Sequence, residues 1–139
     1  MSSLDLVAYP LRHARRLIVT VLDARRREVF SAHYRPVPGG VQRDGDYRVG
    51  PVRELVADLE ATGEEVLLAG DGVARYRREL SDLERSEEAG PGFDAPSVSA
   101  LVELATGRFE REEFCAPWDV LPLYLRASDA ELHWEAARR

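Results

Sequence analysis

The chain has 139 residues, enough for one domain with a modest core, and it is 45% hydrophobic and 32% charged, as globular proteins are. Its formal net charge of -6 argues against broad, nonspecific affinity for nucleic acid or anionic membranes. No apolar stretch reaches the roughly 18 residues that a membrane span needs. No secretory signal opens the chain, so we expect a cytoplasmic protein.

All 19 basic residues are arginine, which we interpret as the codon bias of a GC-rich genome. The single cysteine, Cys115, allows no internal disulfide and fits a reducing compartment. A reactive thiol and a small side chain that is buried or partly buried are the two interpretations of Cys115. We expect the second.

The first predicted element is a helix that Ser3 caps and that Pro10 kinks or shortens. A hairpin follows. Leu17 to Leu22 is apolar and β-branched, which is typical of a buried strand, and Val29 to Tyr34 alternates as a half-buried strand does. The turn between them, from Asp23 to Glu28, is charged.

A turn at 36–40 precedes a third strand within 41–49, and Gly50-Pro51 starts a helix that Gly63 ends. The apolar stripe of this helix is Val52, Leu55, Val56 and Leu59. Residues 65–69 form a short buried strand, which Gly70-Asp71-Gly72 turns into a helix. In that helix Asp71 is expected as the cap, and the residues expected to face inward are Val73, Tyr76 and Leu80.

Residues 81–94 are acidic and glycine-rich, which predicts a loop. Pro96-Ser97 opens another helix, expected to close at Gly107. Residues 109–121 are expected to be irregular and 122–126 extended, with a tail from 128 to 139 that forms a short helix or frays. The mixture of elements predicts an α/β or α+β domain with a small sheet.

Gly70, Asp71 and Gly72 form the first candidate site. A buried strand, two glycines and a helix start can bring a ligand close to backbone amides. The same pattern also describes a plain strand-to-helix turn, which is the more common case and the one we expect.

The charged hairpin turn, with Asp23, Arg25, Arg26, Arg27 and Glu28, is the second candidate. Two carboxylates can serve as acid and base. A solvated turn would not raise a carboxylate pKa, so we expect Asp23 and Glu28 to pair with arginines or to shape the turn. A contact surface for another protein, formed by Arg25 to Glu28, is more plausible than a catalyst.

The remaining candidates carry less information. His13, His33 and His133 lie far apart and form no metal-binding spacing, so we predict no metal site and no catalytic residue. The aromatic side chains near the C-terminus can stack on bases or pack against the core, and packing is expected. These aromatic residues are Trp118, Tyr124 and Trp134.

Four segments in order resemble the second domain of the TsaB (YeaZ) family. One of them is the hairpin motif Asp23-Ala-Arg-x-x-Glu-Val29. The others are Ser2-Ser-Leu-Asp-Leu-Val-Ala8, Leu67-Leu-Ala-Gly-Asp-Gly-Val73 with Tyr76, and Pro122-Leu-Tyr-Leu-Arg126. The sequence departs from the family pattern at Arg27, where the family often has glycine, and at Pro10.

The resemblance implies the second lobe of an actin-like ATPase fold related to ribonuclease H, with a small mixed sheet and flanking helices. Residues 1–127 would be this C-terminal domain and 128–139 a tail, with the family's first domain absent from this chain. The family's catalytic partner carries a His-x-x-x-His metal motif, which this chain lacks. In the superfamily, the glycine turn lies near the adenosine of a bound nucleotide.

The function implied is that of a non-catalytic accessory domain without a cofactor. In the family, TsaB supports TsaD, with the ATPase TsaE, in transferring threonylcarbamoyl to N6 of adenosine 37 of tRNA. Contact with tRNA would be indirect. A domain alone would expose an apolar surface, for which the first helix, Leu4 to Leu11, is the expected lining, and a homodimer is one outcome. The alternatives are a ligand- or nucleotide-binding α/β domain and a glycoprotease-like enzyme.

Overall fold

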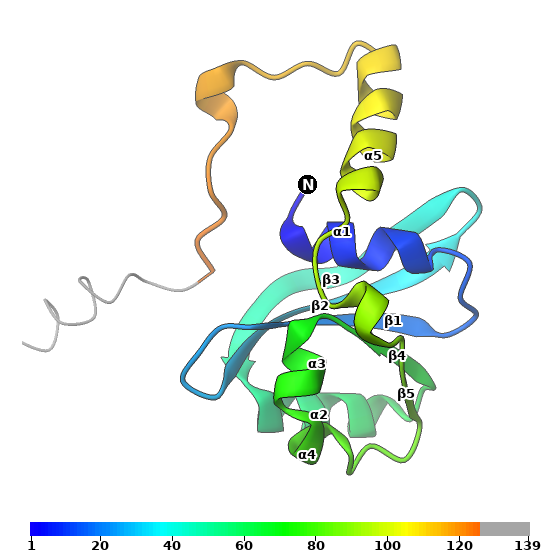
Figure 1. Ribbon diagram of the computed structural model, residues 1–139, viewed down its shortest axis with the longest axis vertical. Helices are drawn as coiled ribbons and strands as arrows, with labels where there is room; N and C mark the ends of the chain where they lie inside the picture. Colours follow the sequence, from blue (N-terminus) through cyan, green and yellow to red (C-terminus); the bar gives the residue numbers. More distant parts are fainter. Residues whose placement is uncertain (126–139) are drawn as a thin grey trace, which may run out of the picture.

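The computed structural model describes residues 1–125, which form an α/β arrangement around one five-stranded mixed sheet (Figure 1). The strand order is β3-β2-β1-β4-β5. Antiparallel pairing joins β3, β2 and β1, and parallel pairing joins β1, β4 and β5. The strands are β1 (Leu17–Asp23), β2 (Glu28–Val37), β3 (Gly40–Pro51), β4 (Val66–Ala69) and β5 (Ser86–Glu88).

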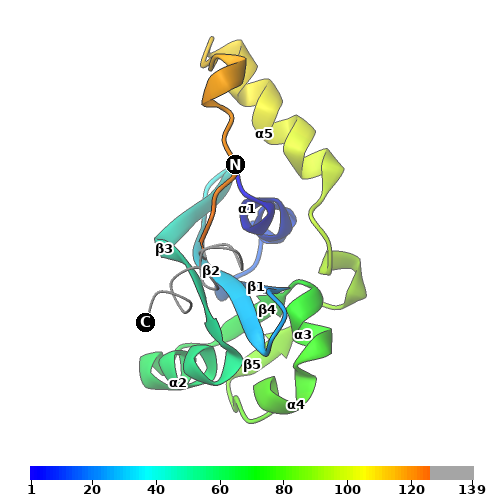
Figure 2. The same cartoon turned by 90° about the vertical axis from the view of Figure 1, so that its left-hand side faces the viewer.

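Helices cover both faces of the sheet (Figures 1 and 2). The helix α1 (Ser3–Ala8) and the 3-10 turn η1 (Tyr9–Leu11) lie on one face. The opposite face is covered by α2 (Val52–Thr62), α3 (Asp71–Arg75) and α4 (Arg77–Leu80). The prediction of a small mixed sheet with flanking helices is therefore confirmed.

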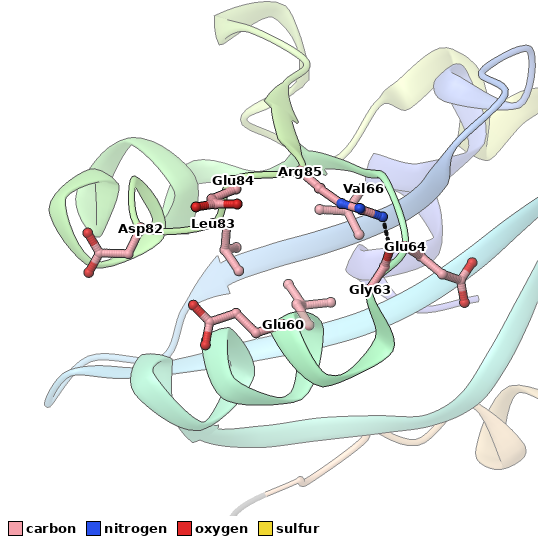
Figure 3. A pocket seen from close by; sticks show the side chains of 9 residues that line it. Glu60, Gly63, Glu64, Val66, Asp82, Leu83, Glu84 and Arg85 are labelled. Carbon is pink, nitrogen blue, oxygen red and sulfur yellow. Dashed lines mark hydrogen bonds between the residues drawn. The ribbon is translucent and has the colours of Figure 1, made fainter.

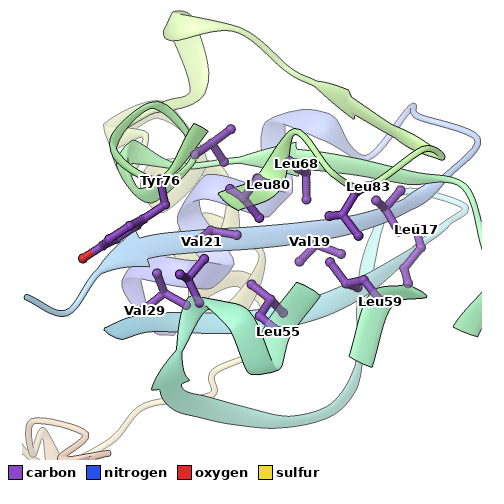
Figure 4. Close-up of a cluster of buried hydrophobic side chains, with 13 residues drawn as sticks. Leu17, Val19, Val21, Val29, Leu55, Leu59, Leu68, Tyr76, Leu80 and Leu83 are labelled. Atoms are coloured by element: carbon purple, nitrogen blue, oxygen red, sulfur yellow. The ribbon is translucent and has the colours of Figure 1, made fainter. Parts of the chain in front are cut away.

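The strand β1 lies at the centre of the sheet, and its side chains pack against the helices on both faces. Leu17, Val19 and Val21 point into the cluster under α2 and α4, shown in Figure 4. Ile18 points into the cluster under α1. Thr20 is fully buried and donates its hydroxyl to the carbonyl of Ala32 at 3.3 Å, so its polar atom is satisfied.

The first helix is short for the reason the sequence indicated: Pro10 lies in the 3-10 turn that follows it. Its cap is Ser2, one residue earlier than expected, and Ser2 and Asp5 form a reciprocal capping box. Leu4, Val7, Ala8 and Leu11 are all buried against the sheet. The expectation that this helix lines an exposed apolar surface was therefore wrong.

The helix α2 follows Pro51 directly, and Gly63 ends it with a left-handed φ of 64°. The stripe residues Val52, Leu55 and Leu59 are buried as predicted, and Val56 packs partly against them.

The segment 81–94 is more ordered than its composition predicted. It contains β5 and the 3-10 turn η2 (Pro91–Phe93). Leu83 is buried, and the amide of Ala89 donates to the carbonyl of Leu68 at 2.8 Å. A short edge strand needs only a few backbone bonds, which acidic side chains on its exposed sides do not prevent.

The last helix, α5 (Val98–Glu110), extends away from the sheet (Figures 1 and 2). The helix opens after Pro96-Ser97 as predicted, with Ser97 as its cap, but it continues for three residues beyond Gly107, where it was expected to close. Beyond it, η3 (Pro117–Asp119) interrupts an otherwise irregular segment. Among residues 1–125, no helix is both long enough and apolar enough to cross a membrane.

Candidate functional site at the hairpin tip and the glycine turn

The fold brings the two candidate sites of the sequence together. Asp23 ends β1 beside the turn from β4 into α3, and its backbone amide donates to Oδ1 of Asp71 at 3.0 Å. Asp71 was expected to cap α3. The structure shows instead that Gly70 occupies the cap position, without a side-chain hydrogen bond. The carboxylate of Asp71 accepts a hydrogen bond from the end of β1.

Both glycines of the turn are required by close packing against β1. A Cβ on Gly70 would lie 2.2 Å from the carbonyl oxygen of Val21, and the φ of Gly70 is +111°, which L side chains rarely adopt. A Cβ on Gly72 would lie 2.8 Å from Cγ1 of Val21. The space beside these backbones is therefore filled by β1, which leaves no approach for a ligand on that side.

A small hollow does border the other side of the turn. Its volume is about 130 Å³, below the roughly 300 Å³ at which small-molecule sites begin. It is lined in part by Gly70, Val73, Arg77, Glu88 and Asp94. Arg77 and Glu88 pair with each other there at 2.9 Å. This hollow is too small for a nucleotide.

The carboxylate of Asp23 is the centre of a hydrogen-bond network that stiffens the hairpin. Oδ1 accepts from the amide of Arg25 at 2.9 Å and from the Tyr76 hydroxyl at 2.9 Å, and Oδ2 pairs with Arg75 at 3.1 Å. The side chain of Asp23 is only 12% exposed. The expectation of a fully solvated carboxylate was therefore wrong, whereas the expectation that Asp23 shapes the turn is confirmed.

These contacts also set the ionisation of Asp23. Burial acts to raise its pKa, but the bonds from Arg25 and Tyr76 and the charge of Arg75 outweigh burial, so the pKa lies below the ordinary value. A carboxylate held in its charged form by donors is a structural acceptor, and it is poorly suited to act as a general acid or base near neutral pH.

The hairpin tip has an unusual backbone. Arg25, Arg26 and Arg27 have φ values of 64°, 55° and 62°, so three consecutive non-glycine residues adopt the left-handed conformation. Each such residue costs about 1 to 2 kcal/mol relative to glycine. Hydrogen bonds compensate locally: Glu28 donates to the carbonyl of Arg25 at 2.9 Å, and Val52 of α2 donates to that of Arg27 at 3.3 Å. All three arginine side chains are exposed.

A second network, which sequence analysis missed, fixes α1 to the sheet. Asp5 accepts from the Tyr34 hydroxyl at 2.7 Å and from the Tyr47 hydroxyl at 2.8 Å. Burial, together with the bond to Asp5, raises the pKa of Tyr34. The one available signal was Asp5 itself, three residues after the capping Ser2. This network holds the fold together and shows no catalytic geometry.

An acidic hollow lies at the other end of the sheet, between α2 and the α4–β5 connection (Figure 3). Its volume is about 430 Å³, and Arg85 spans it by donating to the Gly63 carbonyl at 2.8 Å. The carboxylates around it are those of Glu60, Glu64, Asp82 and Glu84. In the part of the chain that the structure describes, no group of three or more His, Cys, Asp or Glu residues could hold a metal ion.

The remaining candidate residues do not come together in one site. Burial, followed by the charge of Arg48, lowers the pKa of His33, and its Nε2 is buried without a hydrogen-bond partner. Cys115 is an exposed free thiol, so the expectation of a buried or partly buried side chain was wrong. Trp118 and Tyr124 are 78% and 80% exposed, which contradicts the expected packing. Trp134 and His133 lie outside the described residues.

No protein-family model and no curated protein matches the sequence. Solved structures do match the fold. YeaZ from Pseudomonas aeruginosa superposes with a TM-score of 0.68 and 24% identity, over 89% of this chain and 58% of that one. A crystal structure titled as an uncharacterized protein with similarity to peptidase YEAZ, from the same organism, gives 0.67 and 24%, over 91% and 57%.

The chain therefore shares its α/β fold with part of the YeaZ structures. It spans less than two thirds of the length of either structure. The predicted resemblance is confirmed at the level of the fold.

Proposed function

We propose that this chain is the second, non-catalytic domain of a TsaB-type accessory protein, which acts in the cytoplasm and supports a TsaD-type subunit, with TsaE, in forming threonylcarbamoyladenosine at position 37 of tRNA. The observation that carries the proposal is the fold match to YeaZ over about nine tenths of the chain. The four ordered sequence segments add support, and the first three lie on β1–β2, α1 and β4–α3.

The geometry of the glycine turn supports a role without a nucleotide. Gly70 and Gly72 are explained by their contact with Val21, and Asp71 is occupied by the amide of Asp23. No described feature favours the nucleotide-binding or glycoprotease-like alternatives. We therefore expect calorimetry with ATP to give no heat of binding at micromolar concentrations, and a low-micromolar dissociation constant would contradict the proposal.

The test of the proposed role is the modified nucleoside itself. Depleting the gene in its host should lower threonylcarbamoyladenosine in total tRNA hydrolysates, measured by mass spectrometry, and the intact gene should restore it. Unchanged nucleoside levels after complete depletion would refute the role.

A companion measurement concerns assembly. In the TsaB family the partner contacts run mainly through first-domain helices, so the 139-residue chain alone should co-purify poorly with the host's TsaD-type protein. Attaching a first domain of the family should restore retention. Equal retention with and without that domain would mean that the main contact with the TsaD-type protein lies on this chain.

A further inference from the structure

The tip of the β1–β2 hairpin projects from the sheet and ends in three exposed arginines (Figure 1). A tip that served only to connect two strands would carry glycine or asparagine at left-handed positions, since these residues adopt positive φ without strain. Codon bias explains why the basic residues are arginine and not lysine. It does not explain arginine in place of glycine, because glycine codons are equally GC-rich.

Hydrogen bonds hold the strained backbone at Arg25 and at Arg27. Arg25 is bonded through its amide to Asp23, its carbonyl accepts from Glu28, and the carbonyl of Arg27 accepts from Val52. Asp23 is in turn fixed by Tyr76 and Arg75. A conformation that is unfavourable by itself and over-determined by its surroundings is the pattern found at functional contacts. The side chains are thereby presented from a rigid support, which lowers the entropy lost on binding.

We propose that the tip, Arg25 to Arg27, which lies beside the exposed Arg53 of α2, is a docking surface for a carboxylate-rich patch on a partner protein. Arginine matches carboxylates with two parallel hydrogen bonds and is enriched at interface hot spots. The inference rests on the proposed accessory role, because an accessory domain acts by holding other proteins.

Nucleic acid fits the tip less well. Affinity for nucleic acid grows with the number of phosphates that basic side chains neutralise, whereas the tip offers three arginines on a chain of net charge -6. Successive residues of a left-handed turn also point in different directions, as they do along any helix. We therefore expect the tip to meet acidic groups spread over a protein surface more readily than a single phosphate.

The experiment is site-specific photo-crosslinking in the host, with benzoylphenylalanine at position 53, which leaves the three tip arginines intact. The matched control carries the probe at exposed Arg78 on α4. The expected result is a crosslink at position 53, absent at 78, to a peptide rich in Asp and Glu. It should fall at least tenfold in the double variant Arg25→Glu, Arg27→Glu.

A second variant, Arg25→Gly with Arg27→Gly, removes the same two charges while relieving the backbone, so a folding defect of the glutamate variant cannot explain a shared loss. A crosslink to RNA, equal yields at positions 53 and 78, or crosslinks unchanged in both double variants would each overturn the proposal. The nucleoside measurement after gene depletion is a separate readout. It distinguishes a failure of the proposed accessory role from a failure of the proposed docking surface.

Discussion

The sheet with its two helical layers and the region from α5 onward differ in how far their apolar side chains are buried. In the sheet region, β1 and β4 are buried on both faces and the large side chains are almost fully covered. In α5, only Ala100 is buried, and Val98, Val102 and Phe109 are 75%, 59% and 69% exposed. The first region gains its stability from packing within this chain, and the second gains little.

The few contacts of α5 and its cap with the sheet region are made to the N-terminal segment of the chain. The amide of Ser97 donates to the carbonyl of Leu6 at 3.3 Å, and Glu103 pairs with Arg12 at 3.2 Å. A helix of 13 residues is marginal by itself in water. The same sequence thus carries one region whose apolar residues are already partnered and another whose apolar residues still offer a surface. Matched substitutions, one in the sheet region and one in α5, should therefore differ in their effect on the free energy of unfolding.

The largest difference is expected for a pair of glycines. Gly70→Ala should destabilise the protein by about 3 to 5 kcal/mol, because the new methyl collides with the Val21 carbonyl and the φ of +111° is unsuited to alanine. Gly107→Ala in α5 should be neutral or stabilising by up to about 1 kcal/mol, since a Cβ there meets only Arg111 at 3.5 Å. Urea denaturation measures both. Similar values for the pair would break the comparison.

A pair of aliphatic truncations tests the packing directly. Leu68→Ala removes a side chain that is 2% exposed and should cost about 3 kcal/mol in unfolding free energy. Val102→Ala, at 59% exposure, should cost less than about 0.5 kcal/mol. Thermal unfolding is the measurement. A large loss in the α5 variant would mean that the helix is covered by contacts within this chain.

The acidic residues form a third pair. Asp5→Ala should cost about 2 to 3 kcal/mol, because it removes one half of the capping box and leaves the Tyr34 and Tyr47 hydroxyls without their acceptor. Glu103→Ala breaks an exposed ion pair in α5 and should cost under about 0.5 kcal/mol. Chemical denaturation of both variants at neutral pH checks the difference. An equal loss in the two proteins would contradict it.

A smaller effect is expected from the pH dependence of the sheet region. The folded pKa of Asp23 lies below its unfolded value near 3.8, so its stabilisation is present above that pH and is lost as the pH falls through the folded pKa. Asp23→Asn should reduce stability by about 1 kcal/mol at pH 7, with the gap to the native protein closing below pH 4. Unfolding midpoints from pH 3 to 7 are the measurement, and a constant gap would exclude this origin.

The smallest effect concerns the tip, where stability and the proposed contact are expected to oppose each other. Arg27→Gly should stabilise the chain by about 0.5 kcal/mol, because glycine adopts a φ of 62° without strain but adds entropy to the unfolded chain. Arg43→Gly on the edge strand β3 is the control, and it should not stabilise, since glycine weakens strands. Thermal unfolding of both variants decides. Destabilisation by Arg27→Gly would show that the side chain supports the fold.

Local patterns predicted much of the fold. The hairpin, the stripe of α2 and the ending at Gly63 follow from periodicity and from glycine and proline positions, and all are found. The residues Val73, Tyr76 and Leu80 are buried as predicted, but the single helix expected for them is divided at Tyr76 into α3 and α4. The order and sense of the strands were beyond these patterns. The candidate site was named only as two separate segments. Their union depends on β1 and β4 lying side by side, which is a pairing between residues about 50 positions apart.

The sequence by itself determined which segments are apolar on one side, where the chain turns, and that the chain resembles YeaZ. Only the tertiary structure decided that Gly70 and Gly72 serve contact with Val21, that Asp71 binds the end of β1 and does not cap its helix, and that Cys115, Trp118 and Tyr124 are exposed. The reason is physical. A residue's backbone preference and polarity are local, whereas its partner is set by which distant strand or helix the sheet places beside it.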